Sequence, residues 1–205
     1  MGRKFRSLQR TIANRQPKKK IVIYSEGEKT ERDYFEAIKR TYQASVIEIQ
    51  IIEGAGVPLT ISRKAVDAAK AARRLGRRQS YALRDEFWAL FDRDNHPNVP
   101  DAIHRCAAGN VGIAFSNPCF ELWLVLHFQD FDKPDGHHDV QRHLETICAD
   151  YNRHSRKTTD CSKLMHVLEE AEQRAEKQLA RRHKEGDPPG PPFTTVFQLT
   201  RRIRV

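Results

Sequence analysis

Along the first 130 residues, apolar positions occur in two different patterns, one typical of strands and one typical of helices. Four short runs rich in β-branched and aromatic residues have the length and composition of buried strands: KKIVIY, SVIEIQII, EFWALF and NVGIAF. Stretches with apolar residues at helical spacing separate them, at about residues 30–42, 59–75 and 102–107. This order predicts an α/β fold built on a mostly parallel four-stranded sheet with flanking helices.

After Ser116 the pattern changes to helices alone. The stretch PCFELWLVLHF is apolar almost all round, as expected of a buried helix. Two longer amphipathic helices, a GDPPGPP linker and a short final helix follow it. We therefore expect a flexible basic arm over residues 1–18, an α/β core over 19–130, and a helical C-terminal extension over 131–205 packed on that core.

Charged residues are unevenly distributed, and their pattern indicates a polyanionic partner. The chain of 205 residues has a formal net charge of +9, and residues 1–20 hold eight Lys or Arg and no acid. Nucleic acid, DNA or RNA, is the commonest such partner, although a solvated basic face would give the same pattern. The candidate contacts are Lys18, Lys19, Lys20, Arg63, Lys64, Lys70, Arg73, Arg74, Arg77 and Arg78.

The composition disfavours membrane and secreted classes of protein. No apolar run approaches about 18 residues, so the sequence predicts no membrane span. The N-terminus lacks the apolar stretch of a secretory signal. Four cysteines form no CxxC pair and no zinc-type spacing, which is typical of reduced, packed thiols in a cytoplasmic protein.

Carboxylates follow two of the predicted strands, at the edge where ligands collect in parallel sheets. Glu26 follows the first strand, and Asp92 and Asp94 follow the third. Alternate residues of an extended segment point the same way, so the two aspartates can face one ion, and Glu26 joins them if the strands are neighbours. Such a cluster is repulsive unless a hard cation, Mg²⁺ or Mn²⁺, neutralises it. The alternative interpretation is turn formation by Asp and helix-dipole stabilisation by Glu26 or Glu31.

A second tier of candidates lies close to these carboxylates in the sequence or in the buried helix. Lys29 and His96 could contact a substrate phosphate. Glu121 stands one turn into a helix that Asn117 is expected to cap, so a site role and a dipole role are equally open. His127 follows an apolar run and is more readily a packed histidine than a base. The full second tier is Lys29, Glu31, Asn95, His96, Glu121 and His127.

Four blocks of the sequence resemble the signature blocks of RloB-like proteins. They are IYSEGEKTERDYFEAI, WALFDRD, VGIAFSNPCFELWLVLHF and PPFTTVFQL, in order across about residues 20–200. That family is similar to Toprim domains, so the resemblance implies a Toprim/Rossmann-like fold in which Glu26, Asp92 and Asp94 match the Mg²⁺-binding residues. It also implies a nuclease associated with bacterial restriction or phage-defence loci. Toprim nucleases usually carry an ATPase, and we expect any such regulator to be a separate protein.

Two functions of different classes are compatible with these features. The first is a Mg²⁺-dependent nuclease in which Asp92 and Asp94 hold the metal, while Glu26 completes its shell or accepts a proton from water. The second is a non-catalytic module that binds nucleic acid or docks on an ATPase and keeps the acidic cluster for a structural ion. Phosphate transfer on a nucleotide is a third and weaker option.

Overall fold

The computed structural model describes residues 19–27, 29–42, 47–54, 56–76, 85–94, 96–153 and 159–204. Within these ranges one sheet has the strand order β2-β1-β3-β4-β5, and every pair is parallel except β4 with β5. The strands are β1 (Lys19–Ser25), β2 (Ile47–Ile52), β3 (Glu86–Asp92), β4 (Gly112–Asn117) and β5 (Phe193–Thr194). The predicted α/β fold with a mostly parallel sheet is confirmed.

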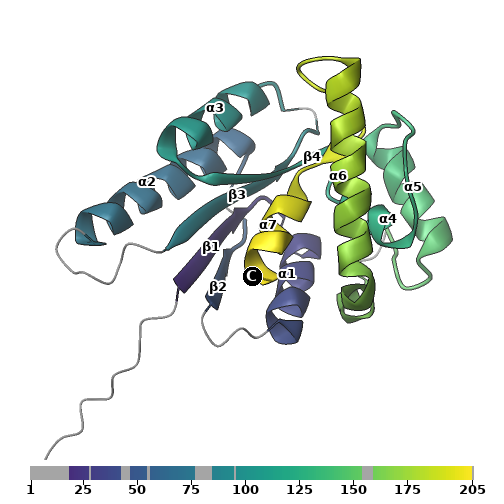
Figure 1. Cartoon of the computed structure of the whole chain (residues 1–205), viewed down its shortest axis with the longest axis horizontal. Coiled ribbons are helices and arrows are strands. Elements are labelled where there is room, and N and C mark those ends of the chain that lie inside the picture. The colour runs from purple at the N-terminus through teal and green to yellow at the C-terminus, as the bar shows by residue number, and fades with distance from the viewer. Residues whose placement is uncertain are drawn as a thin grey trace, which may run out of the picture.

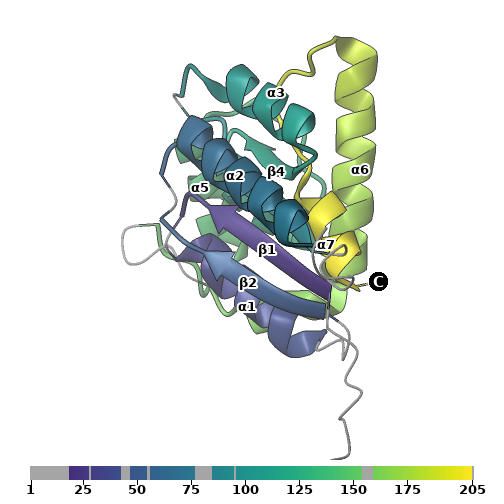
Figure 2. The ribbon, with the colours of Figure 1, turned by 90° about the vertical axis from the view of Figure 1, so that its left-hand side faces the viewer.

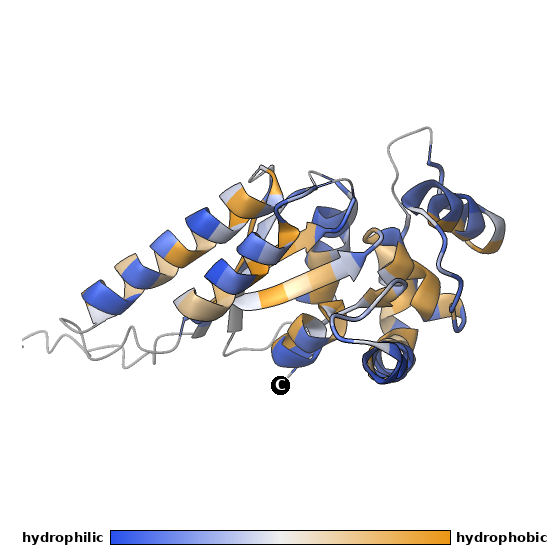
Figure 3. Ribbon diagram, turned by 90° about the horizontal axis from the view of Figure 1, so that it is seen from above, coloured by the Kyte–Doolittle hydropathy of each residue, from blue (hydrophilic) through white to orange (hydrophobic). Residues whose placement is uncertain are grey.

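Helices cover both faces of this sheet (Figures 1 and 2). Helices α2 and α3 lie on one face, whereas α1, α6 and α7 lie on the other. Figure 3 shows hydrophobic residues gathered between the helices and the sheet, with hydrophilic residues on the outward side of α2. The helices are α1 (Thr30–Thr41), α2 (Pro58–Gly76), α3 (Val99–Gly109), α4 (Glu121–Phe128), α5 (His137–Ile147), the 3₁₀ helix η2 (Cys161–Val167), α6 (Leu168–Glu185) and α7 (Val196–Arg204).

Strand β1 contributes to a separate hydrophobic core on each face. Ile21 and Ile23 belong to the cluster that includes α1, α4 and α6, whereas Val22 and Tyr24 belong to the cluster with α2 and α3. Successive side chains of a strand point to opposite faces, so this apolar run is buried on both sides. Burial on both faces holds the carboxyl end of β1 in a fixed position.

Strands β1 and β3 are neighbours, and they meet at the point where the order of the strands along the sheet reverses. The chain runs from β1 through α1 to β2 on one side, and then through α2 to β3 on the other side of β1. Ser25 pairs with Leu90 in the parallel register, so Glu26 and Asp92 leave the sheet at the same edge. A crevice outside the strand ends at such a switch point is the usual ligand site of open α/β sheets. Strands β1 and β3 are therefore neighbours, as the prediction that Glu26 joins the two aspartates required.

The four-stranded prediction misses a fifth strand near the C-terminus. Phe193 and Thr194 form β5, which pairs antiparallel with the end of β4. The Thr195 hydroxyl accepts a hydrogen bond from the Phe115 backbone N–H at 2.9 Å, which ties the segment to the sheet. Two residues are too short to show a strand period, so the pattern could not have revealed β5. The domain boundary at residue 130 stays a prediction.

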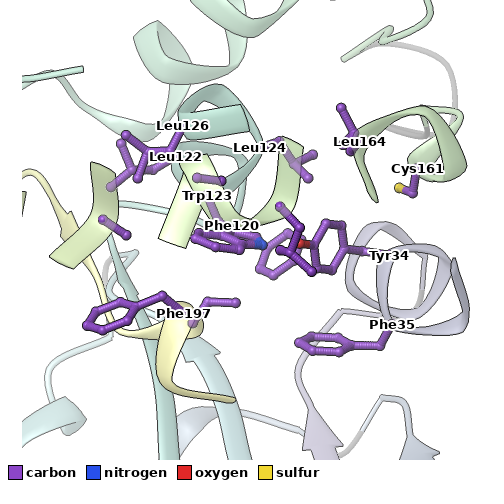
Figure 4. Close-up of a cluster of buried hydrophobic side chains, with 14 of the residues drawn as sticks. Tyr34, Phe35, Phe120, Leu122, Trp123, Leu124, Leu126, Cys161, Leu164 and Phe197 are labelled. Atoms are coloured by element: carbon purple, nitrogen blue, oxygen red, sulfur yellow. The ribbon is translucent and has the colours of Figure 1, made fainter. Parts of the chain in front are cut away.

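Helix α4 is buried on all sides, as its apolar sequence predicts. Each of residues 121–127 is buried. Figure 4 shows Tyr34 of α1 pointing toward Phe120 and Trp123, and its ring lies 5.6 Å and 6.1 Å from theirs in edge-on arrangements. The prediction that Asn117 caps this helix is wrong, because Asn117 pairs in β4 and the helix begins at Glu121.

The cysteine and membrane predictions can be compared with the described residues. Cys106, Cys119, Cys148 and Cys161 are all free and buried, as expected of packed thiols. Among the helices that the structure describes, none has the length and apolar character to cross a membrane.

Candidate functional site

A cavity of about 570 Å³ lies at the carboxyl ends of β1 and β3. Carboxylates from separate parts of the chain meet there, and all three predicted metal ligands, Glu26, Asp92 and Asp94, are among them. The cavity also takes in Lys29, Glu31 and Glu121 from the second tier. The described residues that line it are Glu26, Gly27, Lys29, Thr30, Glu31, Asp92, Asp94, Cys119, Phe120, Glu121, His137, Gln141 and Arg153.

Glu26 is anchored to the neighbouring strand by its backbone and to a loop by its side chain. Its N–H donates to the Leu90 carbonyl at 3.2 Å, which continues the β1–β3 pairing by one residue. A hydrogen bond of 2.8 Å joins its Oε1 to Nε2 of His96. Its Oε2 is buried and has no hydrogen-bond partner among the described residues. Burial raises the pKa of Glu26, and the His96 hydrogen bond opposes that shift.

Asp92 ends β3 and connects it to the segment that leads into α4. Its Oδ2 accepts a hydrogen bond from the Phe120 backbone N–H at 2.9 Å. Burial, followed by the nearby charges of Glu31 and Glu121, raises the pKa of Asp92 well above its usual value. The folded protein without a cation therefore favours the protonated form of this carboxyl group.

Asp94 is exposed at the cavity and has a left-handed backbone conformation. Its φ is 33°, a region that non-glycine residues adopt at a cost and that Asp tolerates better than most. Its N–H donates to the Pro118 carbonyl at 3.3 Å. Strained backbone of this kind occurs both in ordinary turns that contain Asp and at functional sites, so a site role for Asp94 stays a prediction.

Glu31 belongs to this acidic cluster, in addition to starting a helix. It lies in the first turn of α1 and is only 8% exposed. Burial, with smaller contributions from Glu121 and Glu26, raises its pKa from 4.5 to about 7. Its place in the first turn fits helix-dipole stabilisation, and its burial beside the other carboxylates of the cavity fits a site role as well.

The contact between Glu31 and Gly27 gives a first prediction. A β-carbon on residue 27 would overlap the Glu31 carboxylate. We expect Gly27→Ala to turn Glu31 out of place and to weaken Mn²⁺ binding roughly ten-fold, the scale of lost support around a ligand, with little change in melting temperature. Calorimetric titration with Mn²⁺ measures this effect.

Gly136→Ala is the matched control for this prediction. A β-carbon at residue 136 meets nothing within 4 Å, so this substitution should leave Mn²⁺ binding unchanged. Equal Mn²⁺ affinities for the two variants would contradict the role assigned to Gly27.

Glu121 is held by two residues that the sequence did not indicate. Its Oε1 accepts hydrogen bonds from the Tyr151 hydroxyl at 2.9 Å and from the Gln141 amide at 3.2 Å. Both donors lie 20 or more residues away and have no pattern that links them to an active site. Glu121 itself is 5% exposed. A buried carboxylate with satisfied hydrogen bonds fits a structural role in the core as well as a role in the site, so a site role for Glu121 stays a prediction.

One second-tier candidate lies elsewhere, and another is not described. His127 is packed in the core away from the cavity. Its Nδ1 donates to the Trp123 carbonyl at 2.9 Å, and its Nε2 accepts from the Tyr34 hydroxyl at 3.0 Å. Burial lowers the pKa of His127 to about 4, so this packed histidine is neutral at neutral pH. Asn95 falls outside the described residues.

The predicted nucleic-acid contacts have different local environments. One of them, Arg73, donates to the carbonyls of Gly109 and Asn110 at 2.9 Å and so caps the C-terminus of α3. Lys20 is half-buried in β1. The exposed ones on α2 are Arg63, Lys64, Lys70, Arg73 and Arg74. Outside the described part of the chain lie Lys18, Arg77, Arg78 and the side chain of Lys19. Nucleic-acid binding by this set stays a prediction.

The cavity has the donor chemistry of a hard-cation site, but its side chains are not arranged around one point. In the described part of the chain, no three His, Cys, Asp or Glu side chains are grouped closely enough to hold one ion. The oxygens of Glu26, Asp92 and Glu121 that accept hydrogen bonds are turned toward protein donors. Oxygen ligands, raised pKa values and the buried Glu26 Oε2 without a partner all fit a divalent cation. Metal binding by these residues stays a prediction.

Comparison with known proteins gives one match. A family model described as RloB-like protein matches residues 21–203, nearly the whole chain. No curated protein and no solved structure matches.

Proposed function

The chain belongs to the RloB-like family, and from this membership and the acidic cavity we propose that it is a Mg²⁺- or Mn²⁺-dependent nuclease acting on DNA or RNA. The observation that carries the proposal is the meeting of carboxylates from β1, α1, β3 and α4 in one cavity. Their mutual repulsion is tolerable when a cation is bound. A net charge of +9 elsewhere suits a polyanionic substrate.

Asp92 and Asp94 would hold the cation in this proposal, and Glu26 would either complete its shell or act as the base. When bound, a divalent cation neutralises charge on the phosphate and favours ionisation of water. As the base, Glu26 would accept a proton from the attacking water, and its hydrogen bond to His96 would orient it for that step. Lys29 lies at the mouth of the cavity, where it contacts the phosphate.

The family resemblance extends the proposal to a biological setting. We propose that the protein acts in the cytoplasm in a restriction-linked or phage-defence system, together with a separate ATPase. The exposed arginines and lysines of α2 bind the sugar-phosphate backbone with little sequence preference. The likeness to Toprim domains belongs to this proposal as well.

One observation favours a second function, a binding module without catalysis. The described carboxylates are not grouped around one point, and an acidic cluster without catalytic activity would have the same scattered arrangement. This alternative expects salt-sensitive binding of nucleic acid that survives neutralisation of the carboxylates.

A cleavage panel tests the proposed function. The wild-type protein is incubated with DNA and RNA, single- and double-stranded, in Mg²⁺, Mn²⁺ or EDTA, with and without an ATPase encoded beside its gene. We expect cleavage of at least one substrate that depends on the metal and is abolished by Glu26→Gln.

Glu36→Gln is the matched control for the panel, because Glu36 lies on α1 with a 39% exposed side chain and pairs with Lys39. It should cleave as the wild type does. Binding with no cleavage under any condition would favour the binding module, and undiminished cleavage by Glu26→Gln would refute the assigned site.

A further inference from the structure

The cavity has a wall that comes from the C-terminal part of the chain. Helix α5 and the turn after it contribute His137, Gln141 and Arg153 to the lining, together with the carboxylates of the sheet edge. Gln141 holds Glu121, as described above. Arg153 and Lys29 are the two arginine or lysine residues among the described lining residues.

We propose that Arg153 binds a phosphate group of a nucleic-acid substrate inside this cavity. The inference rests on the substrate class of the proposed function and does not require cleavage. Arg153 lies 127 positions after Glu26 in the sequence, and no local motif connects the two.

The position of Arg153 is set by a neighbouring carboxylate. Glu145 accepts the backbone N–H of Arg153 at 3.0 Å through Oε1 and pairs with its Nε at 3.1 Å through Oε2. The two side chains are only 28% and 27% exposed. The guanidinium carries its N–H donors in a rigid fork that matches the geometry of a phosphate. Glu145 therefore orients the guanidinium at the cavity wall.

The negative charge of the cavity explains why an entering phosphate group needs a positively charged side chain in the lining. Glu26, Glu31, Asp92, Asp94 and Glu121 all line the cavity and repel an entering phosphate. A bound metal ion offsets part of that repulsion at the carboxylate wall. Arg153, which lines the same cavity, offsets a further part of it, and an arginine can form two parallel hydrogen bonds with one phosphate.

A purely structural role for Arg153 makes a different prediction. In that case its pairing with Glu145 serves only to fix the turn after α5, and its loss lowers the melting temperature without a specific effect on ligand binding. The experiment must therefore compare binding and stability in the same variants.

The test measures binding of a short fluorescein-labelled single-stranded DNA, and of RNA of the same sequence, by fluorescence anisotropy in Ca²⁺. We expect Arg153→Gln to raise the Kd of the bound probe by at least about ten-fold, the scale of a lost charge-assisted hydrogen bond. Arg153→Lys keeps the charge but not the fork, so its Kd should fall between those of the wild type and Arg153→Gln. The melting temperatures should remain close to that of the wild type.

Arg142→Gln is the matched control, because Arg142 lies on α5, is 64% exposed and pairs with Asp139. It removes the same charge outside the cavity lining and should change the Kd only slightly. Equal Kd values for Arg153→Gln and Arg142→Gln would overturn the proposal, as would a wild-type protein that binds neither probe. A wild type that binds but never cleaves, with Arg153→Gln impaired, would support Arg153 while refuting the nuclease proposal.

Discussion

Asp92→Asn is expected to abolish metal-dependent cleavage and, at neutral pH, to stabilise the protein in the absence of metal. The first effect follows because the substitution removes a metal ligand, and losing several kcal/mol of charge stabilisation slows cleavage about a thousand-fold. The second follows because the pKa of Asp92 is raised well above its usual value, so the folded protein without metal is penalised for ionising this group at pH 7. Asparagine occupies the same space without charge and can still accept the Phe120 N–H.

The sign of the stability effect depends on pH. A raised pKa means that the stability contributed by protonated Asp92 is fully present below its unfolded pKa and is lost as pH rises through its folded pKa. The gain from Asp92→Asn should therefore vanish in acid and grow as the pH rises above the unfolded pKa of Asp92. Thermal unfolding in EDTA, measured beside the cleavage rate in Mg²⁺, tests both effects on one preparation.

Asp67→Asn is the matched control, because Asp67 is exposed on α2 and lies outside the cavity lining. It should change neither cleavage nor stability appreciably. A destabilised Asp92→Asn that cleaves like the wild type would identify Asp92 as a structural residue and would contradict the proposed site.

The part of the site that the sequence predicts is the part that lies at strand ends. Apolar runs buried on both faces and the strand–helix order together indicate where β1 and β3 stop, and hence which edge Glu26 and Asp92 occupy. The prediction had to assume that β1 and β3 are adjacent, because no local sequence pattern encodes the order of strands in a parallel sheet. The structure shows that the two strands pair directly.

The rest of the site depends on contacts between distant segments. Glu31 looks like an ordinary first-turn acid, and only the packing of the segment around Phe120 and Glu121 against the start of α1 makes it a buried one. Tyr151 and Arg153 belong to a polar turn after α5, and nothing in their neighbours predicts that this turn folds over the sheet edge. Tertiary packing decides their roles, so they could not have been chosen from spacing alone.

Glu31→Gln is expected to remove much of the pH dependence of stability of the protein without metal. The pKa of Glu31 is raised from 4.5 to about 7 by burial, with Glu121 and Glu26 adding to the shift. Its contribution to the free energy of unfolding is therefore complete below about pH 4.5 and is lost as pH rises through about 7, an effect of about 3 kcal/mol. Glutamine has no charge to lose, so the variant should be the more stable protein at about pH 8 and should lose this advantage at about pH 5.

Urea unfolding in EDTA at these two pH values measures the difference, with Glu36→Gln on the same helix as the control that should follow the wild type. Mg²⁺ should stabilise the wild type more at about pH 8, where Glu31 is ionised, than at about pH 5, where a proton occupies it. The two effects have one cause, because protons and a divalent cation compete for the same crowded carboxylates. Parallel pH profiles for Glu31→Gln and the wild type would show that Glu31 is not coupled to the cavity, and would remove it from the proposed site.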